Sequence, residues 1–298
     1  MHGTSTGFRR IGSRKLSSSV KSWLLALPVL LFMAVFAAQG LYRAWLESVQ
    51  VDGAGLFSAY TELLTGRTFW ASFGISVYVS FISAVLSVVI GLWLVRLLHR
   101  YFLRDDWKLA VWFPMLIPHF AAAYLTVLFF SPGGWFASVS ASAGLDGFPI
   151  LVNDPLYIGV ILTYLWKEIP FVVLMLLPVY QELDWRMEEA ARSLGAGAWT
   201  RFKTVELPWS GPVLLEVWLI LFVFMLGAYE IPVLLGVTYP SMLPVLAFEW
   251  FYQAGWSQRP LAQAMMVVLT AISAFTAFLL LYIIQRSRRR WLRGGMRA

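Results

Sequence analysis

Three charged side chains lie deep inside long apolar segments, where ionised groups are rare, and a fourth, Glu216, lies near the edge of its segment. Lys167 and Glu168 interrupt the apolar segment 155–179, and Glu230 interrupts the segment 212–235. An ionised side chain at the centre of a membrane-spanning helix costs about 2.5–3.5 kcal/mol on insertion scales. Because that cost must be offset, each of the three is a candidate functional residue.

Glu230 stands among residues that predict a break in its helix. It lies in the run Gly227-Ala228-Tyr229-Glu230-Ile231-Pro232, and Gly236 follows. The proline of this run lacks an N–H group and, with the glycines, predicts a broken or kinked helix. Broken helices near the midplane expose backbone groups to cavities, where solute sites occur. We therefore predict that Glu230 and the adjacent Tyr229 line a solute pathway. The alternative is structural: Glu230 caps the break or pairs with a basic residue such as Lys167.

The other charged or titratable residues of the apolar segments can also have structural roles. Lys167 and Glu168 are adjacent, so they point about 100° apart on a helix and do not face each other. Each is expected to meet another helix, in an ion pair or at a solute site. His119 follows Pro118 near the middle of its apolar segment, where a packing histidine is favoured over a pathway residue. Glu216 lies near the end of its segment and is expected to reach water.

The polar stretch 181–208 has the pattern of two short helices joined by a turn. Apolar residues at helical spacing mark one face of its first half, and charges in favourable i,i+4 pairs mark the other. The apolar stripe consists of Leu183, Met187, Ala190, Ala191 and Leu194, and the pairs are Glu182–Arg186 and Glu188–Arg192. Gly195-Ala196-Gly197 ends this helix, and a second one carries Trp199 and Phe202 and is expected to end at Leu207-Pro208. The stretch is either a connector that packs under a helix bundle or a docking site for another subunit.

The elements that must position these residues are transmembrane helices. The chain has 298 residues, of which 59% are apolar and 13% charged, against about 25% charged in a typical soluble domain. Its mean hydropathy is +0.71. These values exclude an ordinary soluble enzyme and predict an all-α polytopic membrane protein. The chain has no cysteine and only three scattered histidines, so no thiolate or histidine metal site is expected. No H-E-x-x-H or G-x-S-x-G motif indicates an intramembrane enzyme.

Apolar intervals long enough to cross a bilayer predict six transmembrane helices. They cover roughly residues 22–42, 69–96, 108–130, 155–179, 212–235 and 261–285. Residues 1–20 are expected to form a disordered basic tail, and residues 287–298 a second basic tail. The segment 131–154 is expected to be a loop, and 243–254 an interfacial helix with Trp250, Phe251, Tyr252 and nearby Trp256 at headgroup depth.

The second of these spans carries small residues at three- and four-residue steps. They are Ser72, Ser76, Ser80, Ser83 or Ala84, Ser87 and Gly91. Such a stripe predicts close approach of another helix, either in this chain or at a seam between subunits.

The basic residues predict the orientation. Of the 23 Lys and Arg residues, 19 fall in the segments 1–21, 96–108, 186–203 and 286–297, which lie on one side of the six-helix topology. By the positive-inside rule this side, with both termini, is cytoplasmic.

The stretch 181–208 resembles the EAA loop of type I ABC importer permeases. Glu189-Ala190-Ala191, three residues, Gly195, nine residues and then Val205-Glu206-Leu207-Pro208 reproduce the motif spacing, with Val where Ile is common. The resemblance extends over residues 67–286. Within the family, the runs LGAYEIPVLLG (226–236), WFPMLIPHF (112–120) and LWKEIPF (165–171) resemble the spermidine/putrescine-type branch.

The resemblance implies the type I importer permease fold and a division of labour in a bacterial or archaeal cell membrane. The EAA loop would dock on separate ATPase subunits, which bind ATP and Mg, because this chain lacks the phosphate-binding motif G-x-x-x-x-G-K-[ST]. The coupling residues carried over are Glu189, Ala190, Ala191, Gly195, Leu207 and Pro208. The further implied partners are a second permease, identical or homologous, and an extracytoplasmic solute-binding protein. No cofactor or nucleic acid is expected in this chain itself.

The solute and one rival class stay open at this point. Acidic Glu230 and the many aromatic residues favour a small polar or cationic solute, polyamine-like, through charge and cation–π contacts. The rival is an ion-gradient-driven secondary transporter or channel that uses Lys167, Glu168, Glu230 and His119 as a relay. That rival leaves the EAA-like loop unexplained.

Overall fold

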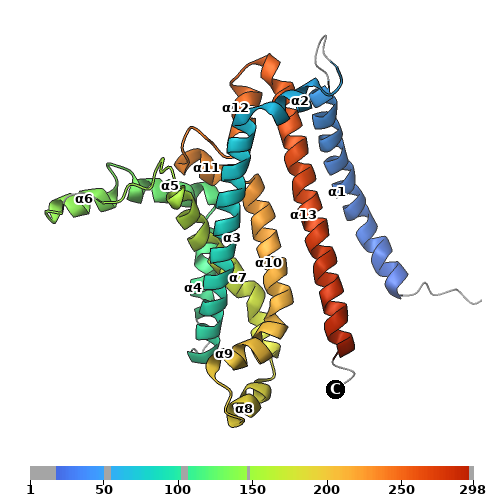
Figure 1. The fold of residues 1–298 in the computed structure, drawn as a ribbon, viewed down its shortest axis with the longest axis vertical. Helices are drawn as coiled ribbons and strands as arrows, with labels where there is room; N and C mark the ends of the chain where they lie inside the picture. Colours follow the sequence, from blue (N-terminus) through green and yellow to red (C-terminus); the bar gives the residue numbers. More distant parts are fainter. Residues whose placement is uncertain (1–17, 50–54, 102–106, 146–147, 295–298) are drawn as a thin grey trace, which may run out of the picture.

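Long helices form a bundle in the computed structural model, which describes residues 18–49, 55–101, 107–145 and 148–294. The longest are α1 (Ser18–Val49), α3 (Arg67–Tyr101), α7 (Ile158–Glu182), α10 (Leu207–Gly227) and α13 (Arg259–Gly294) (Figure 1). In the described ranges every regular element is a helix. The all-α prediction is therefore confirmed.

Among the residues that the structure describes, six helical stretches are long and apolar enough to cross a membrane, which is the number predicted. They are Leu25–Val49, Arg67–Arg100, His119–Ser142, Ile158–Glu182, Ala198–Gly227 and Trp256–Ile284. α13 continues to Gly294, so residues 287–294 are helical where we expected a tail. Residues 1–17 and 295–298 of the predicted tails lie outside the described residues.

α3 and α7 form the centre of the bundle, and α10 packs beside them. All five serines of the predicted small-residue stripe on α3 are fully buried. At Gly91 a Cβ atom would lie 2.6 Å from the Val172 side chain of α7, so only glycine allows the two helices to approach this closely. The Ser76 hydroxyl accepts a hydrogen bond from the Leu243 N–H at 2.7 Å. The stripe thus serves packing within this chain.

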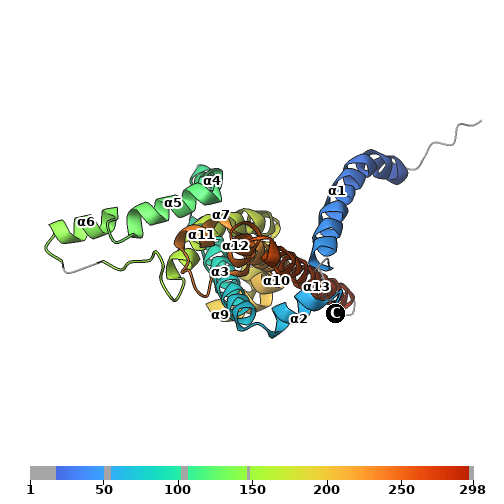
Figure 2. The ribbon, with the colours of Figure 1, turned by 90° about the horizontal axis from the view of Figure 1, so that it is seen from above.

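The third predicted span is not one helix. The chain forms α4 (Trp107–Leu116), breaks at Ile117-Pro118 and continues as α5 (His119–Phe130) and α6 (Trp135–Ser142). Pro118 cannot donate the helical hydrogen bond, which explains the break. α6 also falls in the segment 131–154 that we expected to be a loop. Figures 1 and 2 show α6 extending away from the bundle.

The predicted break in the fifth span is confirmed. α10 ends at Gly227, Ala228 is extended, and α11 (Glu230–Leu235) begins directly after Tyr229. The loop after α11 is held by the Tyr157 hydroxyl, which donates to the Pro240 carbonyl at 2.6 Å.

α12 (Leu243–Tyr252) differs from the expected interfacial helix. Its first half, Leu243 to Ala247, is buried against α3 and α13, whereas Tyr252 is 66% exposed. The apolar first turns therefore belong to the core, and only the aromatic end reaches the surface.

The helix after the turn of the 181–208 stretch does not stop at Leu207-Pro208 as we expected. α8 (Trp185–Ser193) is a separate short helix, but α9 (Ala198–Arg201) continues through a π-helical turn (Phe202–Glu206) into α10. The Leu207 N–H bonds to the Phe202 carbonyl, five residues back. This wider turn accommodates Pro208 in the first turn of α10, where its missing N–H costs little.

α1 lies at the edge of the bundle and packs on α13. It contacts α13 and α2 (Ser58–Thr65). In the apolar stretch of α1 that is long enough to cross a membrane, no residue is buried in this chain. Figure 2 shows its N-terminal half diverging from the bundle. α8 and α9 lie at the end of the bundle where α13 terminates, and α12 lies at the opposite end (Figure 1). We call these the α8 end and the α12 end.

Candidate functional site: the α8–α9 loop and the charged groups of the bundle

α8 is a well-defined helix because both of its ends are capped. The Asp184 carboxylate accepts from the Arg186 N–H at 3.1 Å, which is an N-cap. At the other end Gly195 adopts φ +79°, and the N–H groups of Gly195 and Ala196 bond to the carbonyls of Arg192 and Ala191, each at 3.0 Å. This pair of bonds is the Schellman motif, which favours glycine at its left-handed position.

The apolar stripe of this segment has no partner within the described chain over most of its length. Leu183 is buried, but no residue of α8 itself is buried. Met187 is 49% exposed and Leu194 is 89% exposed. A capped helix that turns large apolar side chains to its surroundings is typical of a surface that another chain covers.

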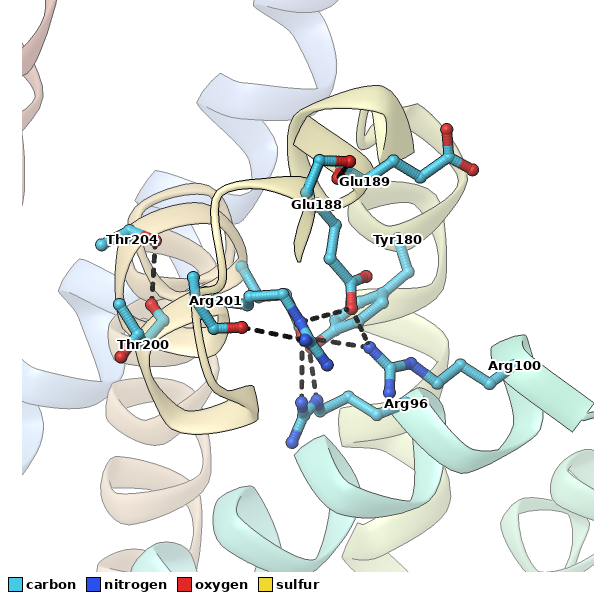
Figure 3. Close-up of polar contacts among 11 residues, drawn as sticks. Arg96, Arg100, Tyr180, Glu188, Glu189, Thr200, Arg201 and Thr204 are labelled. Carbon is cyan, nitrogen blue, oxygen red and sulfur yellow. Dashed lines mark hydrogen bonds and ion pairs between the residues drawn. The ribbon is translucent and has the colours of Figure 1, made fainter. Parts of the chain in front are cut away.

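A buried ion pair joins this loop to α3. Arg96 donates from Nε to Glu206 Oε2 at 2.6 Å and from Nη2 to Glu206 Oε1 at 2.9 Å. The Tyr180 hydroxyl at the end of α7 donates to the same carboxylate at 3.1 Å. Glu206 is 2% exposed, and this bidentate geometry satisfies both of its oxygens. Figure 3 shows the side chains of Arg96, on α3, and Tyr180, on α7, directed toward each other.

A second carboxylate extends this network. Glu188 of α8 pairs with Arg100 of α3, and its Oε1 lies 3.4 Å from Arg201 Nε. Arg100 also lies 3.8 Å from Glu206. The predicted local pair of Glu188 with Arg192 does not form in the structure, because the longer-range partners on α3 and α9 take its carboxylate. The predicted Glu182–Arg186 pair is likewise not among the ion pairs of the described residues.

The structure brings only part of the predicted coupling set together. Glu189, Ala190 and Ala191 lie on α8, and Gly195 closes it. Figure 3 shows the Glu189 side chain pointing away from the network. Leu207 and Pro208 instead begin α10, where they line an apolar groove with Ile284 of α13.

Sequence reasoning missed the residues that hold the loop in place, namely Arg96, Arg100, Tyr180 and Glu206. Two signals were available. Arg96 and Arg100 are one helical turn apart on α3, and Glu206 is an acid inside the quoted motif, next to the apolar start of a span.

Lys167 and Glu168 hold the two sides of the break between α4 and α5. The Lys167 ammonium donates to the carbonyls of Pro114 at 2.8 Å and Ile117 at 2.6 Å, at the C-terminal end of α4. The His119 Nε2 at the start of α5 donates to Glu168 Oε1 at 2.9 Å. A cation at a helix C-terminus satisfies carbonyls that lack helical partners. The 100° angle between the adjacent residues lets each reach a different half of the broken helix.

The predicted alternative pair between Lys167 and Glu230 is not formed among the described residues, because Lys167 is engaged by α4. His119, Lys167 and Glu168 also line a cavity of about 270 Å³ together with Phe171 and Phe224.

Glu230 and Tyr229 occupy the break after α10. Glu230 is the exposed first residue of α11, and Tyr229 packs its ring 4.7 Å from Phe248 of α12. Their role as pathway residues stays a prediction. In the described ranges no group of three or more His, Asp or Glu side chains has the geometry of a metal site.

Comparison with known proteins places the chain in a family. The sequence model of the family "Binding-protein-dependent transport system inner membrane component" matches residues 53–291. The probable sulfate transport permease cysT of Chlorella vulgaris is 31% identical over 168 residues, which are 56% of this chain and 61% of that protein. The trehalose transport permease SugA of Mycobacterium tuberculosis is 28% identical over 216 residues, 70% of this chain and 69% of that protein.

A solved structure shares the fold. It is the crystal structure of a bacterial alginate ABC transporter in complex with an alginate pentasaccharide-bound periplasmic protein, with a TM-score of 0.75 at 18% identity. The match covers 89% of this chain and 95% of the other. These similarities do not support the expected spermidine/putrescine-type branch, since the relatives are named for sulfate and trehalose. The family match covers most of the chain, and the chain belongs to the inner membrane components of binding-protein-dependent transport systems.

Proposed function

We propose that this chain is the permease subunit of an ATP-driven ABC importer and that α8 is the helix on which the ATPase subunits dock. The observation that carries the proposal is the exposed apolar face of α8, with Met187 and Leu194 uncovered on a helix that is capped at both ends. A connector packed under the bundle would bury this face. Glu189, also exposed, is free to pair with a basic residue of the ATPase.

The ion-pair network supplies the path by which motion of α8 would reach the membrane helices. Glu188 links α8 to Arg100, and Glu206 links the start of α10 to Arg96. Both arginines lie on α3, which packs against α7 and α10 in the core. A displacement of α8 by ATP-driven closure of the partner is therefore expected to move the end of α3 with it.

The rest of the proposed mechanism is alternating access, as in the family, in which the pore opens in turn to each side of the membrane. One six-helix chain forms half of a pore, so a second permease, identical or homologous, completes it. An extracytoplasmic binding protein delivers the solute at the α12 end, and the α8 end faces the cytoplasm with both termini. The ATPase subunits bind ATP and Mg, and this chain forms part of the path by which the solute crosses the membrane.

We further propose a small polar or cationic solute, with a polyamine-like cation favoured. Support comes from the charges in the bundle: the Lys167 ammonium donates two of its three N–H groups to carbonyls, whereas the Glu230 carboxylate is exposed and has no side-chain partner among the described residues. The relatives named above carry sulfate, trehalose and alginate by their names, so a panel of cations, sugars and oxyanions is the direct test.

The docking proposal is tested at Gly195, with Gly197 as the matched control. A residue with a Cβ at Gly195 must adopt φ +79°, which costs roughly 1–2 kcal/mol, while Gly197 has φ −65° and open space around it. Gly195→Asp is expected to lower binding-protein-stimulated ATP hydrolysis and uptake together in the reconstituted complex. Gly197→Asp adds the same charge where aspartate is a good N-cap and is expected to leave both near wild type.

The proposal fails if uptake by Gly195→Asp still follows ATP hydrolysis as in the wild type, or if both variants lose coupling equally. Insertion of the chain into the membrane is expected to be unchanged in both, because neither residue lies in a span.

A further inference from the structure

A groove of about 430 Å³ opens between the end of α3 and α9, and its walls combine tryptophans with arginines. It is lined by Trp93, Arg96, Leu97, Arg100, Trp199 and Phe202, and we call it the α3–α9 groove. The proposed importer function uses α8 and the ion pairs behind this groove but leaves the groove itself unassigned.

The groove adjoins the ends of two candidate membrane spans, from which we infer that it lies near the boundary between membrane and water. The candidate span of α3 ends at Arg100, and the candidate span that leads into α10 begins at Ala198, so two spans meet the surface here. Trp93 is 63% exposed and Trp199 is 64% exposed. Indole rings at the ends of spans prefer the headgroup region, where one edge is apolar and the N–H group is wet.

The charges around the groove leave a positive excess. Three guanidinium groups, those of Arg96, Arg100 and Arg201, face two carboxylates, those of Glu188 and Glu206. The side chain of Arg100 is 38% exposed, so its remaining N–H groups are accessible. Lys203 adds a further exposed cation, with its Nζ 4.8 Å from the centre of the Trp199 ring. A phosphate group is the anion whose oxygens match such donors.

An apolar track leads from the groove into the bilayer along α3. Its exposed residues follow helical spacing: Leu86, Val89, Ile90, Trp93 and Leu97. The opposite face of α3 is the buried serine stripe. A headgroup anion with an acyl chain fits this continuous polar-to-apolar surface, whereas a free phosphate ion would use only its upper part.

We propose that the α3–α9 groove binds an anionic phospholipid, with the phosphate between Arg100 and Lys203 and an acyl chain along the exposed face of α3. Juxtamembrane basic pockets between helices are typical sites for anionic headgroups. A lipid bound here contacts the arginines that hold α8 and α10. The proposal requires membrane insertion of the chain but not ATPase coupling, so the two proposals fail independently.

The test is a lipid titration of the purified full-length chain by native mass spectrometry, with phosphatidylglycerol and phosphatidylcholine compared. We expect a tightly bound phosphatidylglycerol that phosphatidylcholine does not replace at equal concentration. Lys203→Gln should weaken the binding of phosphatidylglycerol about fivefold, which is the effect of one cation near an anionic surface. The binding of phosphatidylcholine should not change. Arg286→Gln is the matched control, because it removes an exposed cation from α13 at the same end of the bundle but outside the groove.

Three outcomes overturn the proposal. The first is equal binding of the two lipids. The second is equal weakening by Lys203→Gln and Arg286→Gln, which would indicate a diffuse surface charge. The third is displacement of phosphatidylglycerol by millimolar inorganic phosphate, which would identify a phosphate-ion site instead of a lipid site.

Discussion

Removing the charge of Glu206 should destabilise the chain far more than removing that of Glu189, although both belong to the same motif. Glu206 is 2% exposed and holds Arg96 through two bonds of 2.6 and 2.9 Å. Glu206→Gln keeps the shape and can still accept from Tyr180, but it leaves Arg96 beside a neutral amide. Breaking a buried pair in this way costs about 3–5 kcal/mol.

The lower end of that range applies here, because the Arg96 side chain is 15% exposed and water relieves part of the loss. About 3 kcal/mol corresponds to a fall in Tm of roughly 6–12 °C for a chain of several hundred residues. The assay is thermal unfolding of the purified full chain in detergent, followed by tryptophan fluorescence and by loss of the size-exclusion peak. Glu189→Gln makes the same chemical change at an exposed carboxylate and should leave the Tm unchanged.

A double-mutant cycle separates the ion pair from general effects of substitution. Arg96→Met with Glu206→Met removes both charges at once, and apolar replacement of a buried pair is often nearly neutral. The double variant should therefore be more stable than the sum of the single losses implies, by about 2 kcal/mol. Equal Tm values for Glu206→Gln and Glu189→Gln, or strictly additive losses in the cycle, would refute the view that Arg96 and Glu206 fix the loop to α3.

The remaining predictions concern the bundle and its orientation. Lys167→Met removes the cation from the end of α4 and should lower the Tm by several degrees without changing solute preference; a changed preference at normal Tm would make Lys167 a pathway residue. Glu230→Gln should leave Tm and assembly unchanged but alter uptake rate or solute preference; wild-type kinetics for every solute tried would make Glu230 structural. Reporter fusions after Arg201 and at the C-terminus should report a cytoplasmic location, and a fusion after Gly144 an external one; a cytoplasmic signal after Gly144 would contradict the six-helix topology.

Hydropathy and spacing were sufficient to predict the helical fold and α8 because those features repeat locally in the sequence. The apolar runs mark the spans, and the left-handed glycine at 195 marks the end of α8. The break at Ala228-Tyr229 was also predictable, since proline and glycine act on the backbone within one turn.

What could not be predicted depends on partners distant in sequence. Glu188 has an arginine four residues away, which favours a local pair, yet it binds Arg100, 88 residues before it. Local propensity carries no information on such a contact, because it is decided by how α3 and α8 pack. The end of the helix predicted at Leu207-Pro208 was wrong for the same reason. A proline after a short helix usually indicates that the helix ends, but here a π-helical turn accommodates the proline and the helix continues as α10.

The two broken helices differ in how their ends are satisfied, and this difference bears on function. At the break between α4 and α5, Lys167 and Glu168 are buried and engage both halves, so both charges have structural partners, and their role as pathway residues stays a prediction. At the break between α10 and α11, Glu230 is exposed and makes no hydrogen bond or ion pair with another described side chain. In the first turn of α11 its carboxylate favours the helix N-terminus by about 0.3–1 kcal/mol, which is less than the cost of an ionised side chain at the centre of a span. Because Glu230 has no side-chain partner among the described residues, we predict that it, rather than Lys167 or Glu168, meets a passing solute.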